Sequence, residues 1–130
     1  MKLLLCTISR NNKKRLKSWH SQLDALTDLL LREHDVEISV YENDSTDGTK
    51  EGLKNYVERL AKKCKTTLTS TDLGTDHLVG KEGARVTNIA NARNACIEQA
   101  SSLSEFEKIV FIETDVLYKP LQALEIIHHE

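Results

Sequence analysis

Apolar segments of two different periods alternate along this chain of 130 residues, and this alternation limits the fold more than any other feature. Four segments are typical of β-strands, because their apolar residues are continuous or alternate, or because they are rich in threonine. Four others place apolar residues three and four positions apart, which predicts amphipathic helices. Strands and helices in regular alternation predict a parallel sheet covered by helices.

The predicted elements follow the order βαβαβαβα, with strands at residues 2–8, 36–40, 66–70 and 109–112. The apolar faces of the four helices are carried, in chain order, by Leu16, Trp19, Leu23, Leu26 and Leu30; by Leu53, Tyr56, Val57, Leu60 and Cys64; by Ile89, Ala92, Cys96 and Leu103; and by Leu121, Leu124 and Ile127. Residues 72–83 contain three glycines and are expected to form a loop. We therefore expect one α/β domain over residues 1–130, a Rossmann-like three-layer sandwich with a mainly parallel sheet.

Composition excludes several classes of protein. Hydrophobic residues make up 39% and charged residues 29% of the chain, as in ordinary globular domains. A net charge of −2 gives no basic field for nucleic acid, and no apolar run reaches the roughly 20 residues of a membrane span. Cys6, Cys64 and Cys96 form no CxxC pair, so we expect reduced thiols. The short apolar start lacks a cleavage site, which predicts a cytoplasmic location.

Polar residues gather at the carboxyl ends of three of the predicted strands, at residues 7–11, 42–47 and 113–115. In open parallel sheets, ligands bind beyond the carboxyl ends of the strands. Glu113 and Asp115 are two positions apart, so on an extended chain their carboxylates would point the same way. Such a pair suits a hard divalent cation, Mg²⁺ or Mn²⁺, whose other ligands would be water and phosphate. The alternative interpretation is two solvated acids in a loop.

The end of the second strand and the third helix carry further candidates. Asp47 is expected to cap the following helix, while Glu42 or Asn43 could read the edge of a nucleobase. Asp44 could do the same or stabilise the turn. Arg93 is either a solvated or paired surface arginine, or a clamp for diphosphate oxygens.

Other catalytic motifs are absent from the sequence. It contains no serine nucleophile elbow, P-loop, GxGxxG turn or HExxH spacing, which disfavours hydrolases, kinases and dinucleotide dehydrogenases. His128 and His129 are expected to be terminal surface residues.

Three segments, residues 40–49 (VYENDSTDGT), 88–94 (NIANARN) and 110–117 (VFIETDVL), resemble motifs of GT-A-fold glycosyltransferases in order and spacing. These motifs are the second-strand acidic motif, the A-R-N helix and the strand ending in D-x-D. The sequences ENDSTDGT and ETD also resemble segments of the fungal capsule-associated mannosyltransferase family.

The resemblance implies a metal-dependent glycosyltransferase domain, the nucleotide-binding half of the fold, with a UDP- or GDP-sugar donor and an acceptor that the sequence does not identify. The implied donor-binding residues are Thr7, Ser9, Arg10, Glu42, Asn43, Asp44, Arg93 and Glu113. Asn43 stands where many members have a base-contacting Asp. Asp115 is the implied main ligand of Mn²⁺ or Mg²⁺, and Glu113 would bind ribose, sugar or the metal through water.

Enzymes of this class are usually much longer, and their later half supplies the acceptor groove and often the catalytic base. This chain ends at Glu130 in what reads as an unfinished helix, which predicts a C-terminal truncation or a small relative without acceptor machinery. No catalytic base can be named. One alternative is a non-catalytic pseudo-glycosyltransferase that binds a donor or a partner protein. The other is a nucleotidyltransferase, which the glycine-free segment at residues 9–14 disfavours.

Overall fold

A four-stranded, all-parallel sheet forms the centre of the computed structural model, which describes residues 1–73, 82–101 and 103–129. The main elements are β1 (Lys2–Ser9), α1 (Leu16–Leu30), β2 (Asp35–Asn43), α2 (Thr49–Leu60), β3 (Lys65–Thr71), α3 (Glu82–Glu98), β4 (Lys108–Phe111) and α4 (Pro120–His128). Short 3₁₀ helices at Lys13–Arg15 and Leu103–Glu105 precede α1 and β4. The predicted order βαβαβαβα is therefore confirmed.

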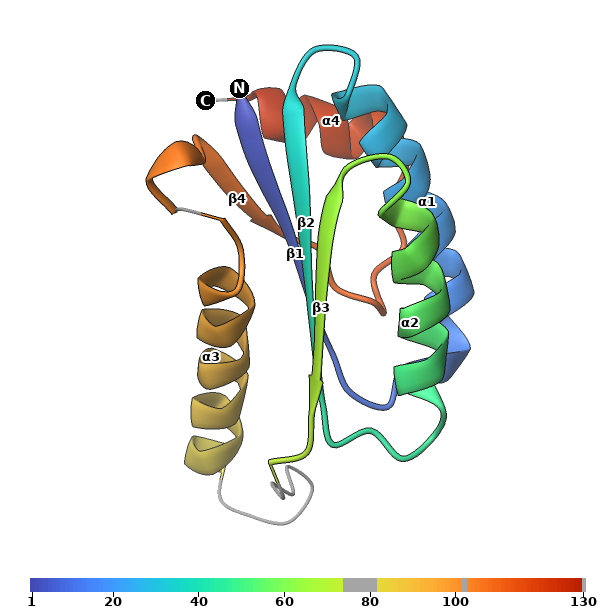
Figure 1. Ribbon diagram of the computed structural model, residues 1–130, viewed down its shortest axis with the longest axis vertical. Coiled ribbons are helices and arrows are strands. Elements are labelled where there is room, and N and C mark those ends of the chain that lie inside the picture. Colours follow the sequence, from blue (N-terminus) through green and yellow to red (C-terminus); the bar gives the residue numbers. More distant parts are fainter. Residues whose placement is uncertain (74–81, 102, 130) are drawn as a thin grey trace.

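The strand order β3-β2-β1-β4 explains why helices cover both faces of the sheet. The chain adds β2 and then β3 on one side of β1, so right-handed crossovers place α1 and α2 on the same face. It then returns past β1 to β4, and this reversed direction places α3 on the opposite face (Figure 1). The predicted three-layer α/β sandwich is confirmed.

The central strand β1 is buried on both of its faces. Leu3 and Leu5 belong to the larger core, shared with α1, α2 and α4, whereas Leu4 and Cys6 belong to a smaller core under α3. A strand covered on both sides cannot alternate apolar with polar residues, which accounts for the continuous apolar run at the start of the sequence.

The structure corrects four details of the predicted elements. Leu121, expected on the apolar face of α4, is 65% exposed. Helix α2 ends at Leu60, so Cys64 lies in the turn before β3 rather than on the helix. Helix α3 begins at Glu82, so Gly83 is helical, and residues 74–81 of the expected loop lie outside the described residues. Ile89 is 37% exposed, since it borders a cleft at the sheet edge instead of the core. The side chain of Leu103 also lies outside the described part. None of the described helices is long and apolar enough to cross a membrane.

Candidate functional site

The carboxyl ends of the parallel strands meet at one end of the molecule, where the first turns of α3 also lie (Figure 1). The chain runs outward from β1 to β3 and then reverses to β4, which makes β1 and β4 the neighbours at the topological switch point. Ligands of doubly wound sheets bind in the crevice at such a point. The structure therefore brings the three predicted strand ends to one edge.

Thr7, near the end of β1, holds two parts of the core together. Its hydroxyl donates to the carbonyl oxygen of Ile112 (2.8 Å) and accepts from the indole Nε1 of Trp19 (3.1 Å). The side chain is buried, so its hydroxyl links β1 to the residue after β4 and to α1. Its implied contact with a nucleoside stays a prediction.

The loop after β1 is ordered by asparagine side chains. Asn12 Oδ1 accepts hydrogen bonds from Ser9 Oγ (3.0 Å) and from the backbone N–H of Arg10 (3.1 Å). Asn11 has a left-handed backbone (φ 52°), and its N–H donates to Ser45 Oγ (3.0 Å) in the turn after β2. The polar loops after β1 and β2 thus form one connected rim. The sequence interpretation gave Asn11 and Asn12 no structural role, because the contacts that join the two loops cannot be read from local sequence.

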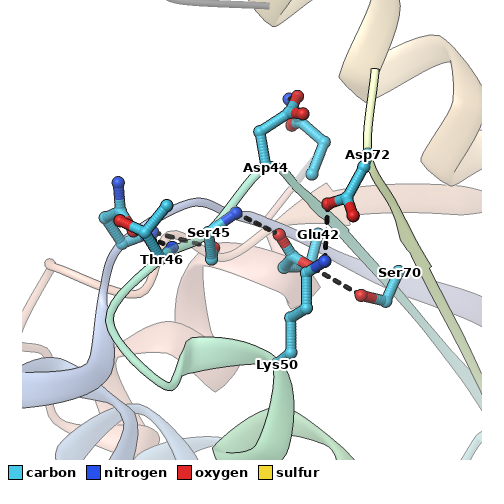
Figure 2. Close-up of polar contacts among 9 residues, drawn as sticks. Glu42, Asp44, Ser45, Thr46, Lys50, Ser70 and Asp72 are labelled. Carbon is cyan, nitrogen blue, oxygen red and sulfur yellow. Dashed lines mark hydrogen bonds and ion pairs between the residues drawn. The ribbon is translucent and has the colours of Figure 1, made fainter. Parts of the chain in front are cut away.

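Glu42 is the last buried residue of β2. Its carboxylate lies between Ser45 and Ser70 (Figure 2). One carboxylate oxygen, Oε2, accepts from the Ser45 N–H (2.9 Å), and the other, Oε1, accepts from Ser70 Oγ (2.5 Å) on β3. Lys50 lies beside this group and pairs with Asp72 (2.5 Å). The hydrogen bond to Asp72 raises the pKa of Lys50 against the opposing effect of burial, and the charges of Asp72 and Glu42 raise it further. Glu42 fastens the turn to the sheet, and its predicted contact with a base remains a prediction.

The two residues after Glu42 are half-buried at the edge of the sheet. Asp44 has a left-handed backbone (φ 56°), a conformation that Asp and Asn adopt more readily than most residues. Its carboxylate accepts from Asn43 Nδ2 (2.8 Å), and its N–H donates to the Thr71 carbonyl (3.0 Å). This turn places Asn43 at the wall of the cleft described below.

Asp47 satisfies one free amide at the start of α2, as predicted, although Gly48 (φ 93°) is the residue at the N-cap position. One carboxylate oxygen accepts from the Thr49 N–H (3.1 Å) and the other from the Lys13 N–H (3.2 Å). Partial burial opposes ionisation, but these bonds and that of the Thr49 hydroxyl outweigh it and lower the pKa of Asp47. Asp47 therefore stabilises the rim and stands apart from the cleft.

A cleft of about 190 Å³ opens between the ends of β1 and β2 and the side of α3. It is lined by Ile8, Ser9, Arg10, Asn43, Asn88, Ile89 and Ala92. Three predicted donor-binding residues, Ser9, Arg10 and Asn43, thus share one wall. Whole-ligand pockets usually measure roughly 300–1,000 Å³, so this cleft suits a fragment about the size of a nucleobase.

Arg93 on α3 reaches the acidic segment that follows β4. Its Nη2 lies 3.3 Å from Glu113 Oε1, and its guanidinium carbon lies 5.5 Å from the centre of the Phe111 ring. The side chains of Arg93 and Glu113 are 46% and 51% exposed. An ion pair this exposed contributes little stability, so a ligand can displace either partner at low cost. Glu113 also borders a second, mainly apolar cavity of about 420 Å³ between β4 and α4.

Asp115 is exposed, and the chain turns at residues 114 and 115. The expectation that an extended chain would align Glu113 with Asp115 is therefore wrong, because β4 ends at Phe111. The donor chemistry nevertheless fits a hard cation, since both groups offer accessible carboxylate oxygens. Among the described residues, no side chain pairs with the Asp115 carboxylate.

This sheet with its polar rim is the nucleotide-binding half of a GT-A-type glycosyltransferase fold. Two solved structures share this fold. S. aureus TarS 1-349 matches with a TM-score of 0.60 and 23% identity, over 98% of this chain and 31% of the TarS chain. The same fragment in complex with UDP-GlcNAc matches with a TM-score of 0.60 and 22% identity, over 98% of this chain and 30% of the TarS chain. Identities this low establish the fold alone. The chain spans about a third of the length of these TarS fragments.

The chain belongs to the family described as Cryptococcal mannosyltransferase 1, whose model matches residues 2–130. Both the resemblance to GT-A glycosyltransferases and the narrower one to fungal capsule-associated mannosyltransferases are thereby confirmed. No curated protein sequence matches the chain.

Proposed function

We propose that this domain binds a nucleotide-diphosphate sugar with the help of a divalent metal and transfers the sugar to an acceptor. The observation that carries the proposal is the meeting, at one sheet edge, of the base-sized cleft with Arg93 and Glu113. The cleft has a polar wall, and beside it Arg93 supplies a cation while Glu113 and Asp115 supply two carboxylates.

We assign the nucleoside end of the donor to the cleft. The amide of Asn43 has both a donor and an acceptor group, as base recognition requires, and Ser9 and Arg10 lie on the same wall. The small volume suits the base, which leaves the diphosphate and sugar on the open rim. A UDP-sugar is the first donor to test, because the TarS complex contains UDP-GlcNAc, and a GDP-sugar is the second.

We assign the diphosphate to Arg93. A guanidinium binds phosphate oxygens through two parallel hydrogen bonds, which are stronger than a single bond to an exposed carboxylate. The contact with Phe111 holds the guanidinium plane near the sheet edge before the ligand arrives. Arg93 would then place positive charge where the departing diphosphate gains negative charge.

Asp115 and Glu113 would hold the Mn²⁺ or Mg²⁺ ion. Such an ion supplies Lewis-acid neutralisation of charge on the leaving diphosphate. Glu113 would exchange its contact with Arg93 for the ion or for the ribose and sugar hydroxyls. The exchange is feasible because both side chains are about half exposed.

Calorimetric titration with UDP-GlcNAc and with a GDP-sugar, each with and without Mn²⁺, tests donor binding. Asp115→Asn should weaken metal-dependent binding at least tenfold, about 1.4 kcal/mol. Glu125→Gln, which removes an exposed carboxylate on α4, is the matched control and should leave affinity unchanged. Equal affinity of wild type and Asp115→Asn would exclude Asp115 from the site.

A second pair of variants tests the assignment of Arg93. Arg93→Ala should weaken diphosphate sugars more than free nucleosides, because only the former have the oxygens that the guanidinium binds. Arg59→Ala is the control, since Arg59 also lies over an aromatic ring, that of Tyr56 (5.5 Å), but on α2. A uniform loss for both ligand types would indicate damaged packing instead of a lost diphosphate contact.

Transfer requires its own test. We identify no catalytic base among the described residues, so donor binding without transfer is the second candidate function. Product formed from a bound donor on a sugar-acceptor array would establish transfer. Donor binding with no product on any acceptor would favour the non-catalytic module.

A further inference from the structure

We infer that Glu33, His34 and His128 form a binding site for a zinc-like divalent cation, a function separate from the proposed donor site. Glu33 and His34 lie in the turn between α1 and β2, and His128 is the last residue of α4. This turn and the end of α4 lie together at the amino ends of the strands, whereas the candidate functional site lies at the carboxyl ends (Figure 1). His128 is exposed, as predicted, but it is joined to a residue 94 positions away.

The distances among the three side chains carry the inference. His34 Nε2 and His128 Nε2 face each other at 2.7 Å, with the rings nearly edge to face. Glu33 adds a carboxylate oxygen, and one ligand atom from each residue lies within 4.8 Å of the other two. Two imidazole nitrogens and one carboxylate thus converge on one point from two elements that are far apart in sequence.

The surrounding contacts hold both histidines in place. The His34 N–H donates to the Leu30 carbonyl at the end of α1 (2.8 Å), and His34 Nδ1 lies 3.3 Å from the Met1 nitrogen. On the other side, Lys108 Nζ donates to the carbonyls of Ile127 and His129 (3.3 Å to the latter), which fixes the backbone on both sides of His128. The backbone that carries the two histidines is therefore fixed before any ion arrives.

The donor chemistry selects the cation. Imidazole suits Zn²⁺, Ni²⁺ and Cu²⁺, whereas Mg²⁺ and Mn²⁺ prefer oxygen ligands, and two His with one Glu is an established zinc set. Tetrahedral coordination at about 2.05 Å places two nitrogens roughly 3.3 Å apart. The present 2.7 Å must therefore widen by roughly 0.6 Å, which the exposed side chain of His128 permits. A hollow bordered by Glu107 leaves space for water at the fourth position.

Two cations lie near the three side chains, the Met1 ammonium and Lys108. Zn²⁺ at His34 Nε2 leaves the imidazole proton on Nδ1, so the Met1 nitrogen, 3.3 Å away, must turn aside or accept that hydrogen bond as a neutral amine. Lys108 borders the same hollow, but its ammonium group is directed to the carbonyls at the end of α4. Glu107 and Glu33 offset its charge. A bound ion would link the turn before β2 to the end of α4 and would stabilise the folded chain, because an ion that binds only the native state shifts unfolding to higher temperature.

Zn²⁺ competition against a chromophoric chelator, together with thermal unfolding in Zn²⁺ and in Mg²⁺, tests the inference on the 130-residue chain. Wild type should bind one Zn²⁺ and unfold at higher temperature with Zn²⁺ but not with Mg²⁺. His34→Gln and His128→Gln should each weaken Zn²⁺ at least roughly tenfold, since even outer-shell losses cost 10–100-fold. His129→Gln, which removes the adjacent exposed imidazole, is the matched control and should bind like wild type.

Two results would overturn the inference: no one-to-one Zn²⁺ binding by wild type, or an equal loss in His129→Gln and His128→Gln. Circular dichroism checks that each variant is folded, and Glu33→Gln, at an exposed turn position, gives an independent ligand deletion if His34→Gln misfolds. Asp115→Asn should leave Zn²⁺ binding intact. Failure of the donor site and failure of this site are therefore distinguishable.

Discussion

Replacing Glu42 should reveal how much the folded state depends on a carboxylate that the sequence alone would place in the ligand site. The carboxylate is fully buried and accepts from the Ser45 N–H and from the Ser70 hydroxyl. Glu42→Ala removes both acceptors and leaves a backbone donor without its partner. Glu42→Gln keeps nearly the same shape, and the Ser70 hydroxyl can reverse its role and accept from the Gln amide.

The magnitudes of the two substitutions differ for this reason. A buried donor left unsatisfied costs about 1–3 kcal/mol, so the two donors freed by Glu42→Ala should together lower the free energy of unfolding by about 2–6 kcal/mol. Glu42→Gln keeps both bonds and loses only their charge assistance, for which we expect about 1 kcal/mol. Against a total stability of roughly 5–15 kcal/mol, the first change is large and the second is small.

Urea unfolding measures both changes, provided that the slope m is unchanged between variants. Glu51→Ala, on an exposed position of α2, is the control and should change stability by about 0.5 kcal/mol or less. A loss below about 1 kcal/mol for Glu42→Ala would refute the view that Glu42 fastens the turn to β3. If Glu42→Gln lowers the free energy of unfolding as much as Glu42→Ala does, then the charge itself, and not the pair of hydrogen bonds, stabilises this turn.

Three other substitutions test the contacts that shape the site, all by urea unfolding. Thr7→Val should cost about 1–3 kcal/mol, because the buried Trp19 Nε1–H loses its acceptor, and a neutral result would contradict this. Gly52→Ala should lower the free energy of unfolding by about 1–3 kcal/mol, because the new Cβ would lie 2.6 Å from Leu16 Cδ1. This clash should outweigh the better helix propensity of alanine. A gain in stability would show that the Leu16 side chain moves aside. Asp47→Ala should be destabilising at neutral pH. Folding lowers the pKa of Asp47, so its ionised carboxylate stabilises the folded state at every pH above its pKa in the unfolded chain, about 3.9. This stabilisation is lost as the pH falls through the pKa of Asp47 in the folded state. Plots of the free energy of unfolding against pH for wild type and Asp47→Ala should therefore converge in acid.

The candidate site could be predicted only in part. Ser9, Arg10 and Asn43 share a cleft because each lies at the carboxyl end of a parallel strand, and the rule for strand ends needs only local patterns. The burial of Glu42 was not predictable in this way, because its partner Ser70 lies on a strand 28 residues away. The turn at residues 114 and 115 also escaped prediction, since strand ends are set by pairing with neighbours rather than by the strand's own residues.

What the sequence determined by itself was the order and type of the elements, because the periods of strands and helices depend on neighbouring residues along the chain. Tertiary structure alone decided that β4 lies beside β1, that Arg93 meets Glu113 and that His34 meets His128. Those contacts depend on which side of the sheet each crossover takes and on how closely the helices pack. The side that each crossover takes and the packing of the helices cannot be predicted from the local spacing of apolar residues, because both depend on burying the apolar residues of the whole chain together.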